Sequence, residues 1–196
     1  MINNEYKFIF IHIGKTGGTS IERVFDPRIG NNVDSDFKGK HWNALKYRKK
    51  HPRKYKKYFK FTFVRNPWDR EVSSYVFFSR IGLTELTFKE RLKERANRRG
   101  NYFGHKDILR QTYNHMITDT HGRYLPDFIG KFENLQSDFD TICDKIGKSR
   151  VKLPHYNKTK RLHYSNYYDD ETREMVANAY ATEIEHFGYK FEQKSS

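Results

Sequence analysis

Apolar residues along the chain fall alternately into short continuous runs and into runs with a spacing of three or four. The continuous runs, rich in β-branched and aromatic residues as buried strands are, span Tyr6–Ile13, Phe59–Val64 and Asp127–Phe132. Helical spacing follows each of them, over Ile21–Phe25, Pro67–Ser79 and Leu135–Ile146. Strands that alternate with helices predict an α/β fold, in which a central, mainly parallel sheet is flanked by helices.

Three further regions are predicted to be helical. In the basic stretch Lys46–Lys60, Pro52 separates two short helices. Leu86–Ala96 is expected to form another helix. Near the end of the sequence, Thr172–Phe187 is expected to be one long helix. No internal repeat, low-complexity block or linker interrupts the sequence, so residues 1–196 are predicted to form a single domain.

The composition adds a strong basic charge to this picture. Lys and Arg number 38 against 24 Asp and Glu, which gives a formal net charge of +14. A chain of this charge attracts polyanions, whether nucleic acid, nucleotides, acidic polysaccharide or anionic lipid. The charge therefore selects the sign of a partner and leaves its identity open.

Three features of the sequence bear on cellular location. No run of apolar residues is long enough to span a membrane, and the polar segment Met1–Tyr6 does not resemble a signal peptide. The single cysteine, Cys143, excludes an internal disulfide and a multi-cysteine zinc site. These features predict a cytoplasmic protein with no membrane span.

The first candidate for chemistry is the glycine-rich segment Gly14–Ser20 (GKTGGTS), between a predicted strand and a predicted helix. Such a turn presents several backbone N–H groups toward one point, and the start of the helix adds about half a positive charge there. Lys15 adds a full charge, and hydroxyl groups come from Thr16, Thr19 and Ser20. The segment is predicted to bind a phosphate-like anion, although glycines that only permit a tight turn would give the same pattern.

This segment departs from the two common nucleotide-binding patterns. The Walker A pattern places a lysine after its last glycine, whereas Lys15 follows the first glycine. No apolar strand ends in an aspartate that would hold Mg²⁺, and the Rossmann G-x-G-x-x-G pattern is missing. The loop therefore suits an anion that is handled without a metal. An ATP-dependent phosphotransferase, the first alternative function, is disfavoured for the same reasons.

A second candidate element follows the second predicted strand. Arg65 ends that strand, and Asn66 and Pro67 are suited to cap and begin the next helix. A guanidinium can grip a phosphate with two N–H groups, and Ser73 lies about two helical turns further on. The alternative is that Arg65 pairs with Asp69 at the helix start. Because ligands bind beyond the carboxyl ends of parallel strands, the two elements together indicate a ligand with two separated phosphate-like groups.

Together, His12–Ser20 (HIGKTGGTS) and Phe63–Tyr75 (FVRNPWDREVSSY) resemble the sulfotransferases that use 3′-phosphoadenosine 5′-phosphosulfate (PAPS). The closer match is to the carbohydrate branch, which contains the heparan 2-O and chondroitin 4-O enzymes and bacterial relatives. The resemblance continues in chain order through Phe128–Leu135, Pro154–Thr159 and Tyr167–Phe191. It implies a P-loop-like three-layer fold and the in-line transfer of a sulfuryl group from PAPS to a hydroxyl of a carbohydrate or glycan, with no metal.

The resemblance also implies roles for individual residues. The first loop would grip the 5′-phosphosulfate through Lys15, Thr16, Gly17, Gly18, Thr19 and Ser20. The second motif would hold the 3′-phosphate through Arg65 and Ser73, and a later segment with Lys158 and Thr159 would close over the donor. Lys15 is also expected to be catalytic, because a cation beside the leaving oxygen stabilises the charge that develops there.

Sulfuryl transfer to an alcohol needs a base that takes the hydroxyl proton, and the chain has nine histidines. His41, in Gly39–Ala44 (GKHWNA), resembles the family's base after the first helix, and an imidazole titrates near pH 6.5. The alternatives are that His41 is an ordinary histidine at a helix start, or that His155 is the base. His155 is otherwise expected to contact the acceptor, and His12, inside the first strand, is expected to pack in the core.

The basic stretch Lys46–Lys60 suggests how an acceptor would be held. One interpretation is a track for an anionic glycan, with Lys46 and Arg48 as substrate-binding residues. Sugar rings would stack on the interleaved tyrosines Tyr47, Tyr55 and Tyr58. The other interpretation is a solvated helical face that attracts nucleic acid without specificity. A non-catalytic polyanion-binding module is accordingly the second alternative function.

Overall fold

A computed structural model of the chain describes residues 1–28, 41–97, 112–154 and 161–193. It divides into two compact units. The first unit, Met1–Arg65 with Tyr113–Tyr156, holds all four strands and is called the sheet unit below. The second, Asn66–Thr112 with Asn157–Ser196, is called the helical unit, and each unit is described by itself.

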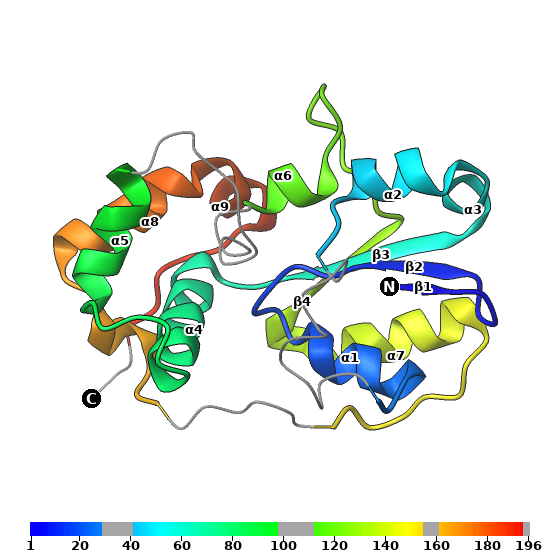
Figure 1. Cartoon of the computed structure of the whole chain (residues 1–196), viewed down its shortest axis with the longest axis horizontal. Helices are drawn as coiled ribbons and strands as arrows, with labels where there is room; N and C mark the ends of the chain where they lie inside the picture. Colours follow the sequence, from blue (N-terminus) through cyan, green and yellow to red (C-terminus); the bar gives the residue numbers. More distant parts are fainter. Residues whose placement is uncertain (29–40, 98–111, 155–160, 194–196) are drawn as a thin grey trace. The chain divides into compact units, whose positions relative to one another are not determined.

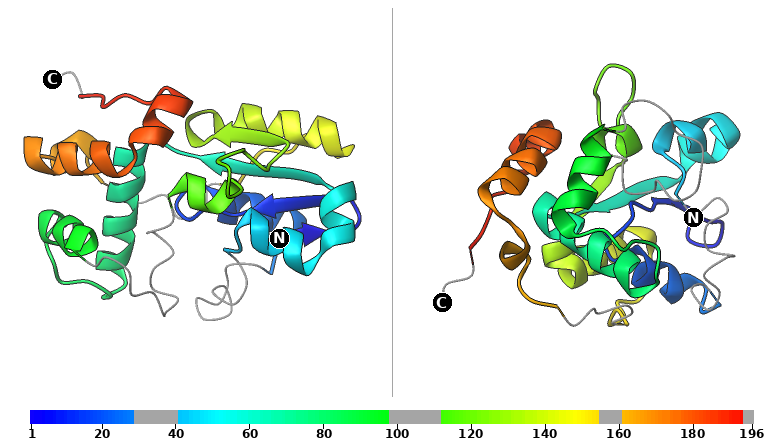
Figure 2. Two further views of the ribbon diagram at one scale, coloured as in Figure 1. Left: turned by 90° about the horizontal axis from the view of Figure 1, so that it is seen from above. Right: turned by 60° about the vertical axis from the view of Figure 1, so that its left-hand side comes forward.

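The sheet unit is built on a four-stranded sheet in the order β1-β2-β3-β4. The strands lie side by side in the left view of Figure 2. Its strands are β1 (Ile2–Asn3), β2 (Phe8–Ile11), β3 (Phe59–Val64) and β4 (Phe128–Lys131). Strand β2 pairs in parallel with β3, and β3 in parallel with β4, while the short β1 is antiparallel to β2. The predicted mainly parallel sheet is confirmed, and so are its three predicted strands.

Helices cover both faces of this sheet (Figure 1). On one side lie α1 (Gly18–Phe25) and α7 (Leu135–Ile146), which follows the short 3₁₀ helix η2 (Phe132–Asn134). On the other side lie α2 (Ala44–Lys50), α3 (Pro52–Lys57) and α6 (Tyr113–Ile117). The predicted α/β fold, with a central sheet flanked by helices, is therefore confirmed, as is the division of the basic stretch at Pro52.

Alternate side chains of β2 and β3 contribute to an apolar core on one face of the sheet. The face toward α1 and α7 is formed by aromatic strand residues and by apolar helix residues, namely Phe8, Phe10, Phe61, Phe63, Ile21, Phe139 and Ile142. These side chains are almost fully buried, so each contributes about 1.5–3 kcal/mol of hydrophobic stabilisation. The core packs along the whole length of β2 and β3 and so supports the strands whose carboxyl ends lead into the loops described below.

Gly130 of β4 shows how tightly this core is packed. It is the register partner of Phe63, and a Cβ at Gly130 would lie 2.5 Å from the Phe63 ring. Any side chain there would displace the ring of a core residue. A glycine in the middle of a strand is unfavourable by itself, and here the close ring contact explains its presence.

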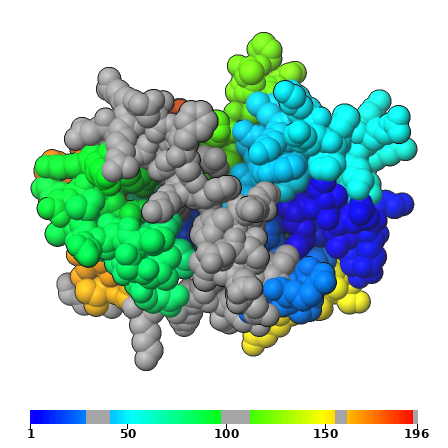
Figure 3. Space-filling view, in the orientation of Figure 1, coloured from blue at the N-terminus to red at the C-terminus, as the bar shows by residue number. Residues whose placement is uncertain are grey.

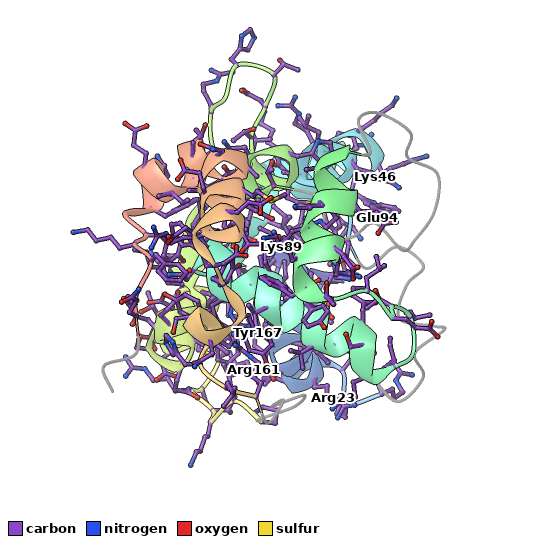
Figure 4. All side chains as sticks on the ribbon, turned by 90° about the vertical axis from the view of Figure 1, so that its left-hand side faces the viewer. Arg23, Lys46, Lys89, Glu94, Arg161 and Tyr167 are labelled. Atoms are coloured by element: carbon purple, nitrogen blue, oxygen red, sulfur yellow. The ribbon has the colours of Figure 1, made fainter. Side chains whose placement is uncertain are left out.

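The helical unit contains α4 (Pro67–Arg80), α5 (Phe88–Asn97), the short 3₁₀ helix η3 (Tyr164–Tyr167), α8 (Asp170–Ala179) and α9 (Ala181–Phe187). Lys89 of α5 faces α8, as the stick view in Figure 4 shows, and forms ion pairs with Asp169 and Glu171. Across the described residues, no helix of either unit has the length and apolar character that crossing a membrane requires.

The prediction of one long helix over Thr172–Phe187 is wrong, because the helix breaks at Tyr180 between α8 and α9. Tyr180 is 3% exposed, and its hydroxyl accepts a hydrogen bond from Arg70 Nη1 and donates one to Glu71 Oε1. Arg95 of α5 forms an ion pair with the same Glu71. The break therefore coincides with a buried polar network that a pattern of apolar residues does not reveal.

Candidate functional site

The loop between β2 and α1 has the backbone shape of an anion cradle. Lys15 and Gly17 both adopt the left-handed conformation, with φ values of 67° and 81°, while Thr16 between them does not. Such an alternation turns successive N–H groups toward one side, which forms a concave site for an anion. Thr16 is fully buried, and its hydroxyl donates to the backbone oxygen of Ile13 at 2.8 Å. The side chain of Thr16 thus supports the turn.

Helix α1 begins directly on this loop, and no side chain caps it. The residue at the cap position is Gly17, which has no side chain, and the first turn contains no acidic residue. The first N–H groups of a helix have no partner within the helix, and the aligned peptide dipoles add a partial positive charge at that end. The start of α1 therefore has the electrostatic character that the sequence predicts for Gly14–Ser20.

Two glycines of the loop are required by close packing. A Cβ at Gly18 would lie 2.2 Å from the ring of His12, and one at Gly17 would lie 2.8 Å from Leu135. Gly17 also has the positive φ that other residues rarely adopt. Both glycines allow the backbone of the cradle to lie directly on the side chains of His12 and Leu135.

Arg65, at the end of β3, lies against the same loop. Its Nη1 donates a hydrogen bond to the backbone oxygen of Lys15 at 3.1 Å, and its guanidinium carbon lies 3.9 Å from the centre of the Phe132 ring. The side chain is 7% exposed, and Tyr113 donates a hydrogen bond to the Arg65 backbone oxygen. The structure thus brings together the two elements that the sequence identifies as anion-binding, Lys15 and Arg65.

His41 lies beside the strand that leads into the cradle. Its Nδ1 is 2.9 Å from the backbone oxygen of His12, and the two imidazole rings have centroids 4.6 Å apart. A carbonyl oxygen can only accept, so Nδ1 must carry the hydrogen in this contact. The neutral ring then has its basic lone pair on Nε2. His41 therefore has the tautomer that a general base requires.

His12 itself has a partner that the sequence did not reveal. Its Nδ1 lies 3.1 Å from Oε2 of Glu22 on α1, and both side chains are almost fully buried. Sequence analysis placed His12 in the core, which its burial confirms, but it did not connect it to Glu22. A histidine inside an apolar strand, just ahead of a glycine-rich loop, was the available signal.

The remaining residues predicted to bind the donor lie outside the sheet unit or outside the described residues. Ser73 is buried on α4 and belongs to the helical unit. Lys158, Thr159 and His155 lie outside the described residues. Their predicted roles remain predictions.

The start of α4 differs from the anion-binding design expected for it. Asn66 Oδ1 accepts hydrogen bonds from the backbone N–H groups of Trp68 and Asp69, at 3.1 and 3.4 Å. The predicted cap is therefore confirmed, and it occupies N–H groups that an anion would otherwise use. Asp69 forms an ion pair with Arg161 within the same unit.

The basic stretch forms a helical hairpin, α2–α3, whose cyan atoms project on the face shown in Figure 3. Its exposed cations are Lys46, Arg48, Lys49, Lys50, Arg53, Lys56 and Lys57. Lys60 instead forms an ion pair with Asp127 at 2.8 Å.

The idea that three tyrosines of this hairpin stack on sugar rings is wrong for two of them. Tyr47 and Tyr55 are 4% and 8% exposed, so their rings belong to the core. Burial raises the pKa of both hydroxyls, that of Tyr55 to about 12. Tyr58 is partly exposed and donates a hydrogen bond to Asn4. The surface of the hairpin is therefore cationic, with little aromatic area.

No metal-binding group of three or more His, Cys, Asp or Glu side chains occurs within the described ranges.

Comparison with known proteins matches residues 1–190 to the model of the sulfotransferase family. A relative from Archaeoglobus fulgidus, itself an uncharacterized protein, is 34% identical over 92 residues, which are 46% of this chain and 68% of the relative. The crystal structure of a sulfotransferase from Alicyclobacillus acidocaldarius aligns with a TM-score of 0.45 and 19% identity. That alignment covers 76% of this chain and 60% of the length of the other protein.

Proposed function

Because the chain belongs to the sulfotransferase family, we propose that it transfers a sulfuryl group from PAPS to a hydroxyl of a carbohydrate acceptor. The family membership rests on a match over nearly the whole chain. The donor and the class of acceptor are the parts that we propose here. They are argued from the cradle, the arginine beside it, the histidine and the basic hairpin.

The contact between Arg65 and the Lys15 loop is the observation that carries the proposal. It holds a guanidinium next to a concave set of backbone N–H groups at the start of α1. Phosphate and sulfate are bound well by arginine guanidinium groups and by backbone N–H groups at the start of a helix. A donor with a phosphosulfate at one end and a separate phosphate at the other fits this pair of elements.

His41 supports the proposed reaction as its base. The hydrogen bond from Nδ1 to His12 leaves the lone pair on Nε2, where it can take the proton of an acceptor hydroxyl. The ring is partly buried beside β2, so its orientation is restricted. When bound, PAPS supplies the sulfuryl group that the deprotonated oxygen receives.

Lys15 is proposed to stabilise the negative charge that develops on the donor side. It lies in the cradle with a left-handed backbone, and its own backbone oxygen accepts from Arg65. A cation held in place before the reaction stabilises a developing charge without reorganisation. The other donor-binding residues that we propose in this loop are Thr16, Gly17, Gly18, Thr19 and Ser20.

The α2–α3 hairpin favours an anionic acceptor. Its exposed cations lie on the two helices that follow His41 along the chain, with Lys46 and Arg48 nearest to it in sequence. Exposed cations raise the local concentration of an anionic ligand, and the effect weakens as salt increases. We therefore propose a carbohydrate with carboxylate or sulfate groups as the acceptor.

The decisive experiment is incubation with PAPS and a panel of neutral and anionic saccharides, followed by mass spectrometry for an added sulfate. We expect sulfation, with faster turnover on anionic saccharides at low salt. His41→Ala should lower turnover by about 10²–10⁴-fold, the usual range for a positioned base. His121→Ala, at an exposed histidine, is the matched control and should retain activity. Absence of sulfate transfer to every saccharide, with PAPS still bound, would refute the carbohydrate acceptor.

A further inference from the structure

We propose that His12 and Glu22 form a buried pair that positions the base, His41. The same pair packs against the donor cradle, so it connects His41 mechanically to the cradle. The inference rests on the proposed function, because it takes His41 as the base. His12 and Glu22 are positioning residues in this account. Neither is proposed to touch a substrate.

His12 contacts both halves of the proposed site. Its ring lies where a Cβ of Gly18 would be, so it packs directly on the first turn of α1. Its backbone oxygen accepts the hydrogen bond from His41 Nδ1, and its ring lies 4.6 Å from the His41 ring. The His12 ring also stacks on the Phe10 ring, with the two ring centroids 5.4 Å apart. A shift of His12 would therefore move the cradle and the base together.

Glu22 explains why a histidine occupies this position. Its Oε2 lies 3.1 Å from His12 Nδ1, and the Glu22 side chain is only 2% exposed. The two atoms lie close together without hydrogen-bond geometry, and a carboxylate oxygen at this distance favours a hydrogen on Nδ1 over a lone pair. The nearby Glu22 carboxylate also helps to raise the pKa of the Tyr47 hydroxyl.

Core packing alone does not account for the pair. Burying a carboxylate costs free energy, and apolar residues of similar volume would fill the same space at a lower cost. Phe10, two residues earlier on the same face of β2, shows that this face accepts an apolar ring. A buried acid–histidine pair in contact with a base is the arrangement that keeps an imidazole in one tautomer and one orientation.

The test uses the tautomer of His41, read from long-range ¹H–¹⁵N correlation spectra of the ¹⁵N-labelled protein. The His41 signals are identified by their loss in His41→Asn. In the wild type we expect hydrogen on Nδ1. In Glu22→Gln and in His12→Phe we expect His41 to shift toward the Nε2–H form, which an unconstrained imidazole prefers. His12→Asn, which keeps a donor at the place of Nδ1, should restore part of the Nδ1–H form.

Kinetics give the second readout. Because small misplacements of a catalytic group cost up to about 10²-fold, Glu22→Gln should lower kcat by about 10- to 100-fold. The dissociation constant for adenosine 3′,5′-bisphosphate should change much less. Glu183→Gln, at a buried glutamate of the helical unit, is the matched control. It should leave the His41 tautomer and kcat as they are in the wild type.

The two readouts separate this inference from the proposed function. An unchanged His41 tautomer in folded Glu22→Gln and His12→Phe would overturn the positioning role, whatever the enzyme does. If the wild type transfers no sulfate while the tautomer still shifts, the positioning role stands and the proposed reaction is wrong. Should Glu22→Gln fail to fold, the comparison of His12→Phe with His12→Asn decides the matter.

Discussion

Helices α1 and α4 each follow a strand of the parallel sheet, yet they begin in different ways. Helix α1 starts on Gly17, without a side-chain cap, and its first turn has no acidic residue. Helix α4 starts on Asn66, whose side chain accepts from two backbone N–H groups, and its first turn contains Asp69. The start of α1 is electrostatically suited to an anion. At the start of α4 the Asn66 side chain already accepts hydrogen bonds from the first backbone amides.

The difference shows that similar sequence order does not mean similar chemistry. Both segments consist of a strand, a short turn and a helix, and both suggested phosphate binding. At the second segment Asn66 caps the first amides of the helix, while the Arg65 side chain lies against the Lys15 loop. Phosphate binding is therefore proposed for the Arg65 side chain and not for the backbone at the start of α4. Three substitutions test this comparison, and a fourth tests a third kind of helix start, the charged cap of α8; they run from the largest expected effect to the smallest.

Gly18→Val should have the largest effect, because its Cβ would lie 2.2 Å from the His12 ring and the start of α1 would have to move. Each charged hydrogen bond that the cradle loses is worth about 1.5–3 kcal/mol. We therefore expect the dissociation constant for adenosine 3′,5′-bisphosphate to rise by about 10²-fold, measured by calorimetry. Gly122→Ala, at a glycine of the same unit with a φ of 77° and open space around it, adds backbone strain away from the cradle and controls for general destabilisation. Unchanged affinity in a folded Gly18→Val would contradict the cradle.

Arg65→Lys should weaken the same nucleotide by about tenfold. Lysine keeps the charge, but it lacks the planar fork that donates to Lys15 and lies over Phe132. Arg91→Lys is the matched control, because the Arg91 guanidinium also lies over a phenylalanine, Phe78, in the helical unit. Equal losses in the two variants would show that nucleotide binding does not depend on Arg65 specifically.

Asn66→Ala should lower stability and leave nucleotide affinity nearly unchanged. Loss of the cap costs about 1 kcal/mol, and the hydrogen bond from Asn66 Nδ2 to the Lys190 backbone oxygen is lost as well. Urea denaturation measures the first effect and calorimetry the second. Asn66→Asp keeps the cap but cannot donate to Lys190, so it should recover only the part of the stability that the cap contributes. A fall in affinity as large as that of Gly18→Val would mean that α4 also binds the donor.

Asp169→Asn should have the smallest effect, confined to the pH dependence of stability. Asp169 caps α8, and the Lys89 ammonium holds the pKa of this carboxyl below its usual range. A lowered folded-state pKa contributes stability above the ordinary aspartate pKa of about 3.9, and this contribution disappears as pH falls. Asparagine keeps the cap, so the variant should be slightly less stable near neutral pH and match the wild type in acid. Thermal melts between pH 2 and 7 would detect this, and a constant difference would contradict it.

The sequence was sufficient for the elements with strong local patterns. The predicted bounds of β3 and α7 match residue for residue, because their apolar spacing is regular and the flanking residues end each element clearly. The cap at Asn66 and the division at Pro52 were also predicted correctly, since both depend on the properties of one residue. Local physics decides these features.

Other features depend on contacts between residues far apart in the sequence. The break at Tyr180 accompanies hydrogen bonds to Arg70 and Glu71, more than 100 residues earlier. Tyr47 is buried because it lies on the face of α2 that packs against the sheet. A stretch rich in lysine has no regular apolar spacing from which that face could be predicted. The pairing of His12 with Glu22 depends on how α1 packs on β2. Single-residue patterns cannot specify such pairs.

The two faces of the α2–α3 hairpin have different roles. Tyr47 and Tyr55 are buried in the unit's interior, while seven of its lysines and arginines are exposed to solvent. Each exposed lysine or arginine could therefore be exchanged for a neutral or acidic residue without rebuilding the hydrophobic interior. Such exchanges would change the ionic-strength dependence of acceptor binding in small steps. Evolution has the same freedom, so acceptor preference could change between polymers of different charge density while the fold is retained.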